Sequence, residues 1–348
     1  MSESAKTIAK GRAVIRWLFA AAFIFAVGAT GLFTGLMNRA GLFFLVFGSI
    51  AAALMGFTGK EVAEAFRQAA GRGRDTESLE KSAYFWQAAA RNAWILGALG
   101  SSLNFIIALS RESSGIKDIS NRMIQSLIVM LYGLVLAAVC LIPEMKLAGR
   151  AEGTRLLGQS GPAPGAAGRP SLGRRAIASD RVIGYLLFAA VLVMSVILLI
   201  KGQPQSGPLP ISKLLLHGPA YLVVLGGTVA LALFVGAGVG ARAWTLGFAM
   251  TGLISLLMGL IQALFGFVHK NVGEIASAVA FIISASSLAL LGLLAVASPL
   301  EDREVMEGRR EGPGALSRLF WVLLPLLTFI FLILTFIMVV TPMQQKVS

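Results

Sequence analysis

The sequence predicts an all-α membrane protein with nine transmembrane helices, arranged as two parallel four-helix repeats followed by one C-terminal helix. Hydrophobic residues make up 56% of the 348 residues, charged residues make up 14%, and the mean hydropathy is +0.79. A soluble domain carries about 25% charged residues, so this chain offers little polar surface to water. Apolar segments of about 20 residues recur along it, the length that crosses a bilayer as a helix.

Composition and charge also argue against several classes of function. The net charge of +13 is interpreted as basic loops beside anionic lipid rather than as a nucleic-acid surface. The single cysteine, Cys140, lies in an apolar segment, which predicts no disulfide. His217 and His269 are far apart in the sequence and suggest no metal pair. Because no nucleophile and base occur in a catalytic pattern, we expect no enzyme, no cofactor and no metal site.

Nine apolar segments are predicted to be spans. The first, residues 14–36, is longer than the core of a signal peptide, which takes about 7–15 residues, so we interpret it as an uncleaved span. The other eight are residues 41–57, 93–109, 123–142, 182–200, 219–235, 243–267, 275–296 and 319–340.

The polar residues 60–91 are predicted to form a basic helical hairpin. Their first part is rich in helix-forming residues. A glycine- and arginine-rich turn at Gly71 breaks the pattern, and Asp75 is a plausible N-cap for a second helix, with Leu79 and Ala88 on one face. The hairpin is expected either to lie at the headgroup level or to serve as a docking surface for partner subunits.

A segment rich in Gly, Pro, Ala and Arg separates the two halves of the chain. Residues 144–180 show no hydrophobic periodicity, which is typical of a flexible linker. The expected domains are a first repeat at 1–146 with its cytoplasmic hairpin at 60–91, a linker at 147–180, a second repeat at 181–304, and a cytoplasmic segment with the ninth helix at 305–348.

The distribution of Lys and Arg predicts the orientation. With the N-terminus placed in the cytoplasm, the inside segments hold 22 of the 30 basic residues and the outside segments hold 8. Cytoplasmic loops carry an excess of Lys and Arg. The bias therefore favours a cytoplasmic N-terminus and, with nine spans, an external C-terminus.

The second half of the sequence is predicted to repeat the first. When the spans are aligned in order, changes of register fall only in loops, where insertions and deletions are tolerated. The second copy lacks the basic hairpin. Four spans per copy is an even number, so both copies enter the membrane from the same side. Examples of aligned pairs are Val14 with Val182, Gly48 with Gly227, Trp94 with Trp244, and Pro143 with Pro299.

Three stretches of the first copy carry a resemblance to a known family. Residues 42–57, followed by Gly-Lys-Glu-Val-Ala-Glu-Ala-Phe-Arg at 59–67, look like a second span and its exit into the cytoplasm. Phe85-Trp86 with residues 96–101 looks like the entry into a third span, and residues 131–143 look like the end of a fourth. Together they resemble the MotA/TolQ/ExbB proton-channel family, in particular its short-loop, four-span members. The resemblance covers residues 14–146 and, more faintly, 182–304.

The resemblance implies a partner and a location. Members of this family form oligomeric rings around the single spans of a partner that supplies a membrane carboxylate. This chain is therefore expected to form a homo- or hetero-oligomer. The expected partner is therefore an ExbD/MotB-like single-span protein with an intramembrane Asp, and the expected location is the bacterial inner membrane. No Asp, Glu, Lys or His lies at the centre of any predicted span, which fits this division of labour.

The resemblance also implies pore-lining hydroxyls on the third and fourth spans. At the fourth-span positions the first copy has Val129 and Met130, which cannot hydrogen-bond, whereas the second has Ala285 and Ser286. An alternative is that these hydroxyls bond to the carbonyl one turn earlier or pack against a neighbouring helix. The pore-lining candidates are Ser101, Ser102, Asn104, Thr251, Ser284, Ser286 and Ser287.

Three functions remain open at the level of sequence. The leading hypothesis is a duplicated subunit that acts with its partner in transport or force transmission driven by the proton motive force. The second is a non-conducting scaffold derived from the same family. The third is a small-molecule transporter of two parallel halves, although the expected intramembrane charges or matching helix breaks are not found.

Overall fold

The computed structural model describes residues 39–71, 76–109, 116–158, 182–194, 218–230, 240–269, 272–307, 319 and 321–334. These residues are helical apart from a few turn positions, and they contain no strand. The chain divides into two units, Met1–Arg39 and Ala40–Ser348, and the helices below belong to the second. The predicted first span at 14–36 lies outside the described residues.

The first two described helices meet at a sharp bend. Helix α3 (Arg39–Gly56) is apolar, whereas α4 (Gly59–Ala69) is amphipathic, and the two are bent by 113°. A reciprocal capping box starts α4, because the Thr58 side chain accepts from the Glu61 backbone N–H while the Glu61 carboxylate accepts from the Thr58 N–H. At its far end Gly71 adopts a φ of +92°, which favours glycine. The predicted glycine break in the hairpin is confirmed.

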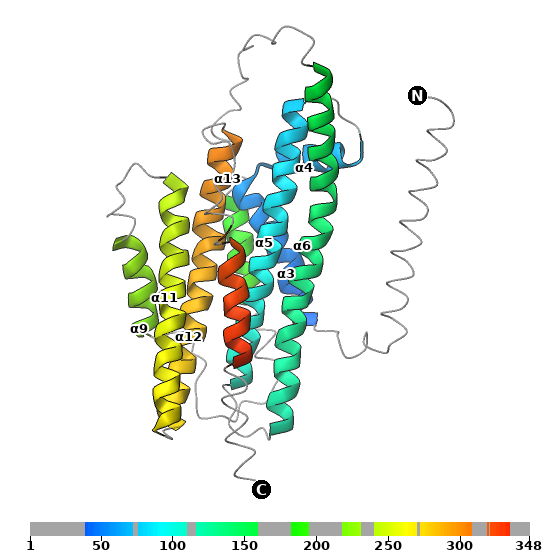
Figure 1. Cartoon of the computed structure of the whole chain (residues 1–348). Helices are drawn as coiled ribbons and strands as arrows, with labels where there is room; N and C mark the ends of the chain where they lie inside the picture. Colours follow the sequence, from blue (N-terminus) through cyan, green and yellow to red (C-terminus); the bar gives the residue numbers. More distant parts are fainter. Residues whose placement is uncertain are drawn as a thin grey trace. The chain divides into compact units, whose positions relative to one another are not determined.

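Helices α5 (Thr76–Leu109) and α6 (Ile116–Gly158) form the central hairpin of the first half (Figure 1). They approach closely at Gly97 and Gly133, where a Cβ on either residue would lie under 3 Å from the other's Cα. Small residues permit such a close approach between helices in lipid. Helix α5 begins at Thr76, directly after the predicted N-cap Asp75.

Helix α6 corrects the predicted start of the linker. It runs without interruption through Pro143 to Gly158, so residues 147–158 are helical rather than part of a linker. Neighbouring helices make an internal proline tolerable in membrane helices. Here Leu147 and Ala151 pack against Leu79 and Ala83 of α5, which extends the hairpin beyond its apolar part.

The second half contains a shorter hairpin and three further helical segments. Pro299 has no backbone N–H to donate to the preceding turn, and a π-helical turn directly precedes the helix in which Pro299 lies. The hairpin consists of α11 (Gly240–Val268) and of α12 (Val272–Gly292), which continues through η2 (Leu293–Ala297) into α13 (Ser298–Met306). The three further segments are Val182–Met194, α9 (Gly218–Tyr221) continuing through η1 (Leu222–Gly226) to Ala230, and Trp321–Leu334.

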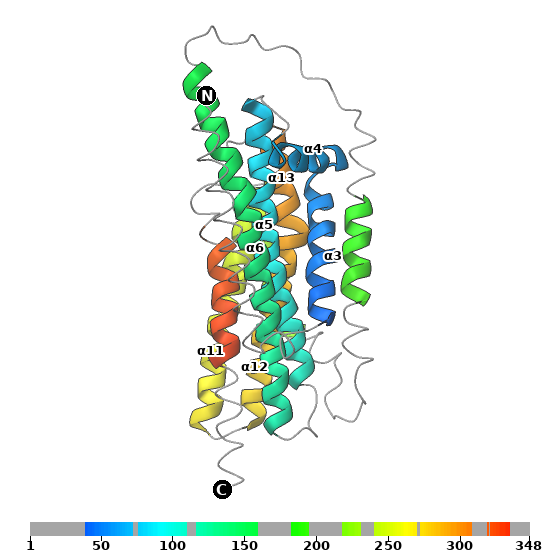
Figure 2. The same ribbon diagram turned by 90° about the vertical axis from the view of Figure 1, so that its right-hand side faces the viewer.

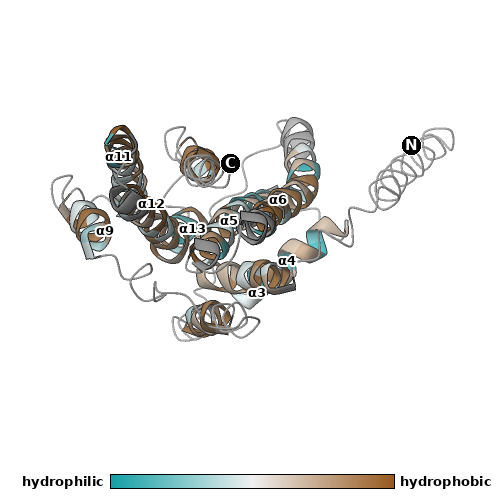
Figure 3. Ribbon diagram, turned by 90° about the horizontal axis from the view of Figure 1, so that it is seen from below, coloured by the Kyte–Doolittle hydropathy of each residue, from teal (hydrophilic) through white to brown (hydrophobic). Residues whose placement is uncertain are grey.

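Three of the described helices are long and apolar enough to cross a bilayer, or four if the bent pair α3 and α4 counts as one span. Their outer surfaces are apolar: on α6 the exposed hydrophobic residues run from Ile124 to Met145, roughly 32 Å at 1.5 Å per residue. A hydrocarbon core is about 30 Å thick. Hydrophobic residues, in brown, predominate on α3, α11 and α12 in Figure 3. The all-helical, apolar character is confirmed, whereas nine spans in two repeats stay a prediction.

Gly48 and Gly227, which are aligned in the two predicted copies, each lie against the predicted third span of their own half, but against residues that are not aligned with each other. In the first half, a Cβ on Gly48 of α3 would lie 3.0 Å from Leu96 on α5. In the second, a Cβ on Gly227 would lie 2.7 Å from Thr251 on α11. In both halves, therefore, a glycine of the predicted second span lets the predicted third span approach closely.

Candidate functional site

The predicted pore hydroxyls of the first half lie inside the bundle. Ser101 and Ser102 are fully buried. The Ser101 hydroxyl lies 2.9 Å from that of Ser126 on α6, and the Ser102 hydroxyl donates to the Ala98 carbonyl at 3.0 Å. Asn104 donates through Nδ2 to the Gly100 carbonyl, also at 3.0 Å.

The candidates of the second half show the same pattern. The Thr251 hydroxyl donates to the Gly247 carbonyl at 2.7 Å and lies 3.0 Å from the Thr228 hydroxyl. Ser286 donates to the carbonyl of Ile283 at 3.1 Å, and Ser284 is buried. The hydroxyl of Ser287 is buried without a hydrogen-bond partner. The seven candidates are thus spread over three helices, and most of those with known partners bond to their own helix.

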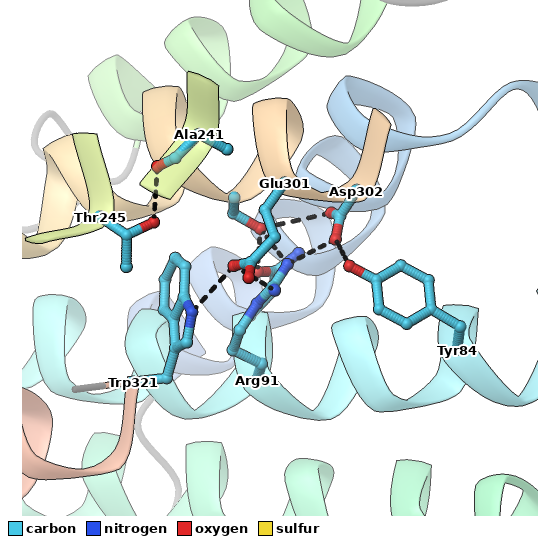
Figure 4. Close-up of polar contacts among 9 residues, drawn as sticks. Tyr84, Arg91, Ala241, Thr245, Glu301, Asp302 and Trp321 are labelled. Carbon is cyan, nitrogen blue, oxygen red and sulfur yellow. Dashed lines mark hydrogen bonds and ion pairs between the residues drawn. The ribbon is translucent and has the colours of Figure 1, made fainter. Parts of the chain in front are cut away.

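A different polar site lies where α5, α13 and the helix Trp321–Leu334 meet (Figure 4). Arg91 comes from α5, and the adjacent acids Glu301 and Asp302 come from α13. The Arg91 side chain is only 9% exposed, and those of Glu301 and Asp302 are 0% exposed. We call these three residues, with Tyr84, Asn92, Ser298 and Trp321, the ionic cluster.

Asp302 accepts hydrogen bonds from two side chains through one carboxylate oxygen. Its Oδ1 accepts from Arg91 Nη2 at 2.7 Å and from the Tyr84 hydroxyl at 2.9 Å. The Tyr84 hydroxyl is therefore a donor to the buried Asp302 carboxylate.

The remaining contacts connect Arg91 to two other groups. Arg91 also donates to the Ser298 hydroxyl, which donates in turn to Asn92 Oδ1 at 2.8 Å. The Arg91 guanidinium carbon lies 4.4 Å from the centroid of the Trp321 ring, a cation–π contact. The Trp321 indole N–H donates to Glu301 at 3.0 Å. One guanidinium thus links the first half, the second half and the last helix.

The ionic cluster lies near one edge of the apolar band rather than outside it. Counting along both helices from the contact between Gly97 and Gly133, Arg91 is level with Val139 of α6, roughly 9 Å before Met145. Val139 and Met145 are 52% and 64% exposed. Charges at such depth are costly unless they are paired and turned towards the protein interior, and these are both.

The polar contacts of the ionic cluster join α5, α13 and the helix Trp321–Leu334. In the described part of the chain, no group of three or more His, Cys, Asp or Glu side chains could hold a metal ion. The charged groups of the cluster make contacts between α5, α13 and the last helix, although Arg91 Nε is buried without a hydrogen-bond partner. These contacts connect helices from the two halves of the chain.

Sequence reasoning missed the ionic cluster. Glu301 and Asp302 fell in the predicted polar segment after the eighth span, and Arg91 fell at the end of the basic hairpin. The signal that could have identified them is positional, because Arg91 immediately precedes a third span and the two acids immediately follow a fourth. Opposite charges at the same membrane edge attract each other, so this position predicts an ion pair.

Replacing Gly56 with alanine should destabilise the protein by about 1–3 kcal/mol. A Cβ at Gly56 would lie 2.6 Å from Asp302 Oδ2, so it would displace a carboxylate that Arg91 and Tyr84 hold. Thermal unfolding of the purified protein measures the effect. Gly226→Ala is the matched control, since a Cβ there has nothing within 4 Å; equal stability of the two variants would contradict the prediction.

Comparisons with known proteins add no evidence for the family resemblance described above. No family model, no curated protein and no solved structure matches the chain.

Proposed function

We propose that this chain is an integral subunit of the bacterial inner membrane that acts as a scaffold for an ExbD/MotB-like single-span partner. In this proposal two parallel halves, each resembling a MotA/TolQ/ExbB subunit, are joined in one chain with a cytoplasmic N-terminus. The partner supplies the membrane carboxylate, and the chain supplies a rigid helical wall within an oligomer.

One observation favours the scaffold over the conducting form of this proposal. The hydroxyls of Ser102, Thr251 and Ser286 each donate to a carbonyl of their own helix, and all three residues are buried. A hydroxyl whose O–H already donates a hydrogen bond within its own helix can only accept a hydrogen bond, through its lone pairs, from another group. Most of the candidate hydroxyls with known partners therefore serve the packing of this chain.

Two features that both halves share support the two-half organisation. Gly48 and Gly227 each admit the neighbouring third span, and α6 and the α12–α13 segment each continue as helix past an aligned proline, Pro143 or Pro299. The ionic cluster then fastens α5 of one half to α13 of the other. Such fastening suits a subunit whose halves keep a fixed relation while a partner moves or pulls.

Replacing Thr251 with valine and Ser286 with alanine in one variant should leave proton flux unchanged. The liposomes contain the chain together with the single-span partner that co-purifies with it, because conduction needs the partner's carboxylate. The scaffold proposal expects liposomes with the wild-type chain to pass protons no faster than empty liposomes, and expects the variant to match. Flux is read with an enclosed pH-sensitive dye under an imposed gradient. A wild-type flux that the double variant abolishes would overturn the scaffold and establish conduction.

A conducting role is the second candidate, because Ser287 offers one hydroxyl that differs from the rest. It is buried on α12 without a hydrogen-bond partner, so it is available to water or to a carboxylate. Adding Ser287→Ala to the flux measurement tests this candidate directly. Loss of flux in this variant alone would favour conduction through Ser287.

A further inference from the structure

Helix α4 turns away from the direction of α3 at the end of the bundle that carries the ionic cluster. The two helices are bent by 113°, and Figure 2 shows α4 lying across the upper end of α3. Only residues 57 and 58 separate the two helices. With the apolar helix α3 along the membrane normal, α4 therefore runs close to the plane of the bilayer.

A contact with α6 fixes the level of the far end of α4. Lys146 Nζ donates to the carbonyl oxygen of Ala69, the last residue of α4, at 3.5 Å. Lys146 directly follows Met145, where the exposed apolar surface of α6 ends. The end of α4 therefore lies at the edge of the apolar band.

Contacts with α5 place the middle of α4 at the same level. The centroids of the Phe66 and Trp86 rings are 4.9 Å apart, and Trp86 Nε1 donates to the Ala65 carbonyl oxygen at 3.4 Å. Counting along both helices from the glycine contact between α5 and α6, Trp86 is level with Glu144 of α6. Glu144 directly precedes Met145. Contacts with two different helices thus give α4 the same level.

The exposed surface of α4 has an apolar side and a charged side. The fully buried Ala65 holds the helix in a cluster with Phe85 of α5. Phe66 is 56% exposed, and Ala63, three residues earlier and also exposed, lies on the same side of the helix. The charged residues lie on the adjoining side, and they are Lys60, Glu64 and Arg67. Helices with one apolar and one charged face bind in the plane of a membrane surface.

We propose that α4 lies in the membrane–water interface, with the Phe66 ring inserted between the phospholipid headgroups and the acyl chains. The surface that covers Phe66 is then the phospholipid of the bilayer. Two observations favour lipid over a protein partner: α4 lies level with the end of the apolar surface of α6, and Phe66 contacts Trp86 at the level where aromatic residues are enriched in membrane proteins. Because the link to α3 is so short, anchoring α4 also fixes the depth of α3.

This inference goes beyond the proposed function and does not depend on it. It requires that α6 crosses the bilayer, and it holds for a scaffold and for a conducting subunit alike. A proton flux that depends on Thr251 and Ser286 would remove the scaffold proposal and leave the position of α4 unchanged.

Nitroxide labels on α4 test the proposal in the full chain, reconstituted in nanodiscs of phosphatidylcholine and phosphatidylglycerol. Cys140, the only cysteine, is first replaced with serine. A label at Phe66→Cys should be more accessible to oxygen than to a water-soluble nickel complex, at a depth of about 5–10 Å below the headgroups. A label at Lys60→Cys, on the charged side of the same helix, should be more accessible to the nickel complex.

A second variant keeps the test independent of the Phe66 side chain. Ala63→Cys places the label on the same apolar side and replaces only a small exposed residue, so it should report the same preference for oxygen as Phe66→Cys. Circular dichroism checks that each labelled chain keeps the helix content of the unlabelled one.

Three outcomes would overturn the proposal. Greater accessibility of both apolar-side labels to the nickel complex would place α4 in water. Protection of these labels from both reagents would mean that protein, either a second copy of the chain or another subunit, covers this surface. Equal accessibilities at positions 60 and 66 would mean that the two sides of α4 do not meet different surroundings.

Discussion

Replacing Arg91 with leucine is expected to destabilise the protein by about 3–5 kcal/mol, because it leaves buried carboxylates without their cation. Asp302 would lose its 2.7 Å ion pair while remaining inaccessible to water, and Trp321 would lose its cation–π contact. The measurement is the free energy of unfolding of the purified protein, followed by circular dichroism in mixed micelles.

Arg303→Leu is the matched control for this prediction. Arg303 also lies on a helix beside an acid, pairing with Glu307 at 2.7 Å, but its side chain is 47% exposed. Exposed pairs contribute about 0–1 kcal/mol, so the control should be nearly neutral. Equal effects of the two substitutions would mean that the ionic cluster is solvated rather than buried.

A triple variant separates the cost of an unpaired charge from the value of the cluster. Replacing Arg91, Glu301 and Asp302 with leucine in one variant should recover most of the stability lost in Arg91→Leu. Apolar residues often replace a buried ion network without loss of stability. A triple variant as unstable as the single one would contradict this account. What the network then provides is a fixed register between the halves.

Some helix boundaries could be predicted from the sequence because local chemistry determines them. The glycine turn at Gly71 and the start of α5 next to Asp75 follow from residues within one turn of each boundary. The buried face of the hairpin, with Leu79 and Ala88, follows from spacing alone. These properties depend on neighbours in the sequence.

The ionic cluster and the length of α6 could not be predicted in this way, because both depend on distant residues. Arg91 and Asp302 are separated by more than 200 positions, and hydropathy assigns each of them to a polar segment outside the membrane. Residues 147–158 look like linker until Leu79 and Ala83 provide a surface for Leu147 and Ala151. This tertiary contact supports the helix where hydropathy alone predicts a linker.

Gly133→Ala is expected to destabilise the α5–α6 hairpin by about 1–3 kcal/mol or more, because the methyl group has nowhere to go. Its Cβ would lie 2.6 Å from the Cα of Gly97 and 2.9 Å from the Ala93 carbonyl oxygen. Both are backbone atoms, which cannot rotate aside as a side chain can. The helices would have to separate along their contact, and unfolding in mixed micelles measures the loss.

Gly149→Ala is the matched control for Gly133→Ala, because it is the same substitution on the same helix. A Cβ at Gly149 has nothing within 4 Å, so alanine should stabilise the helix there by up to about 1 kcal/mol through propensity alone. The two variants should therefore change stability in opposite directions. If both were stabilising, α5 and α6 would not approach at backbone distance, and Arg91 would no longer be placed level with Val139, inside the apolar band where only a paired charge is tolerated.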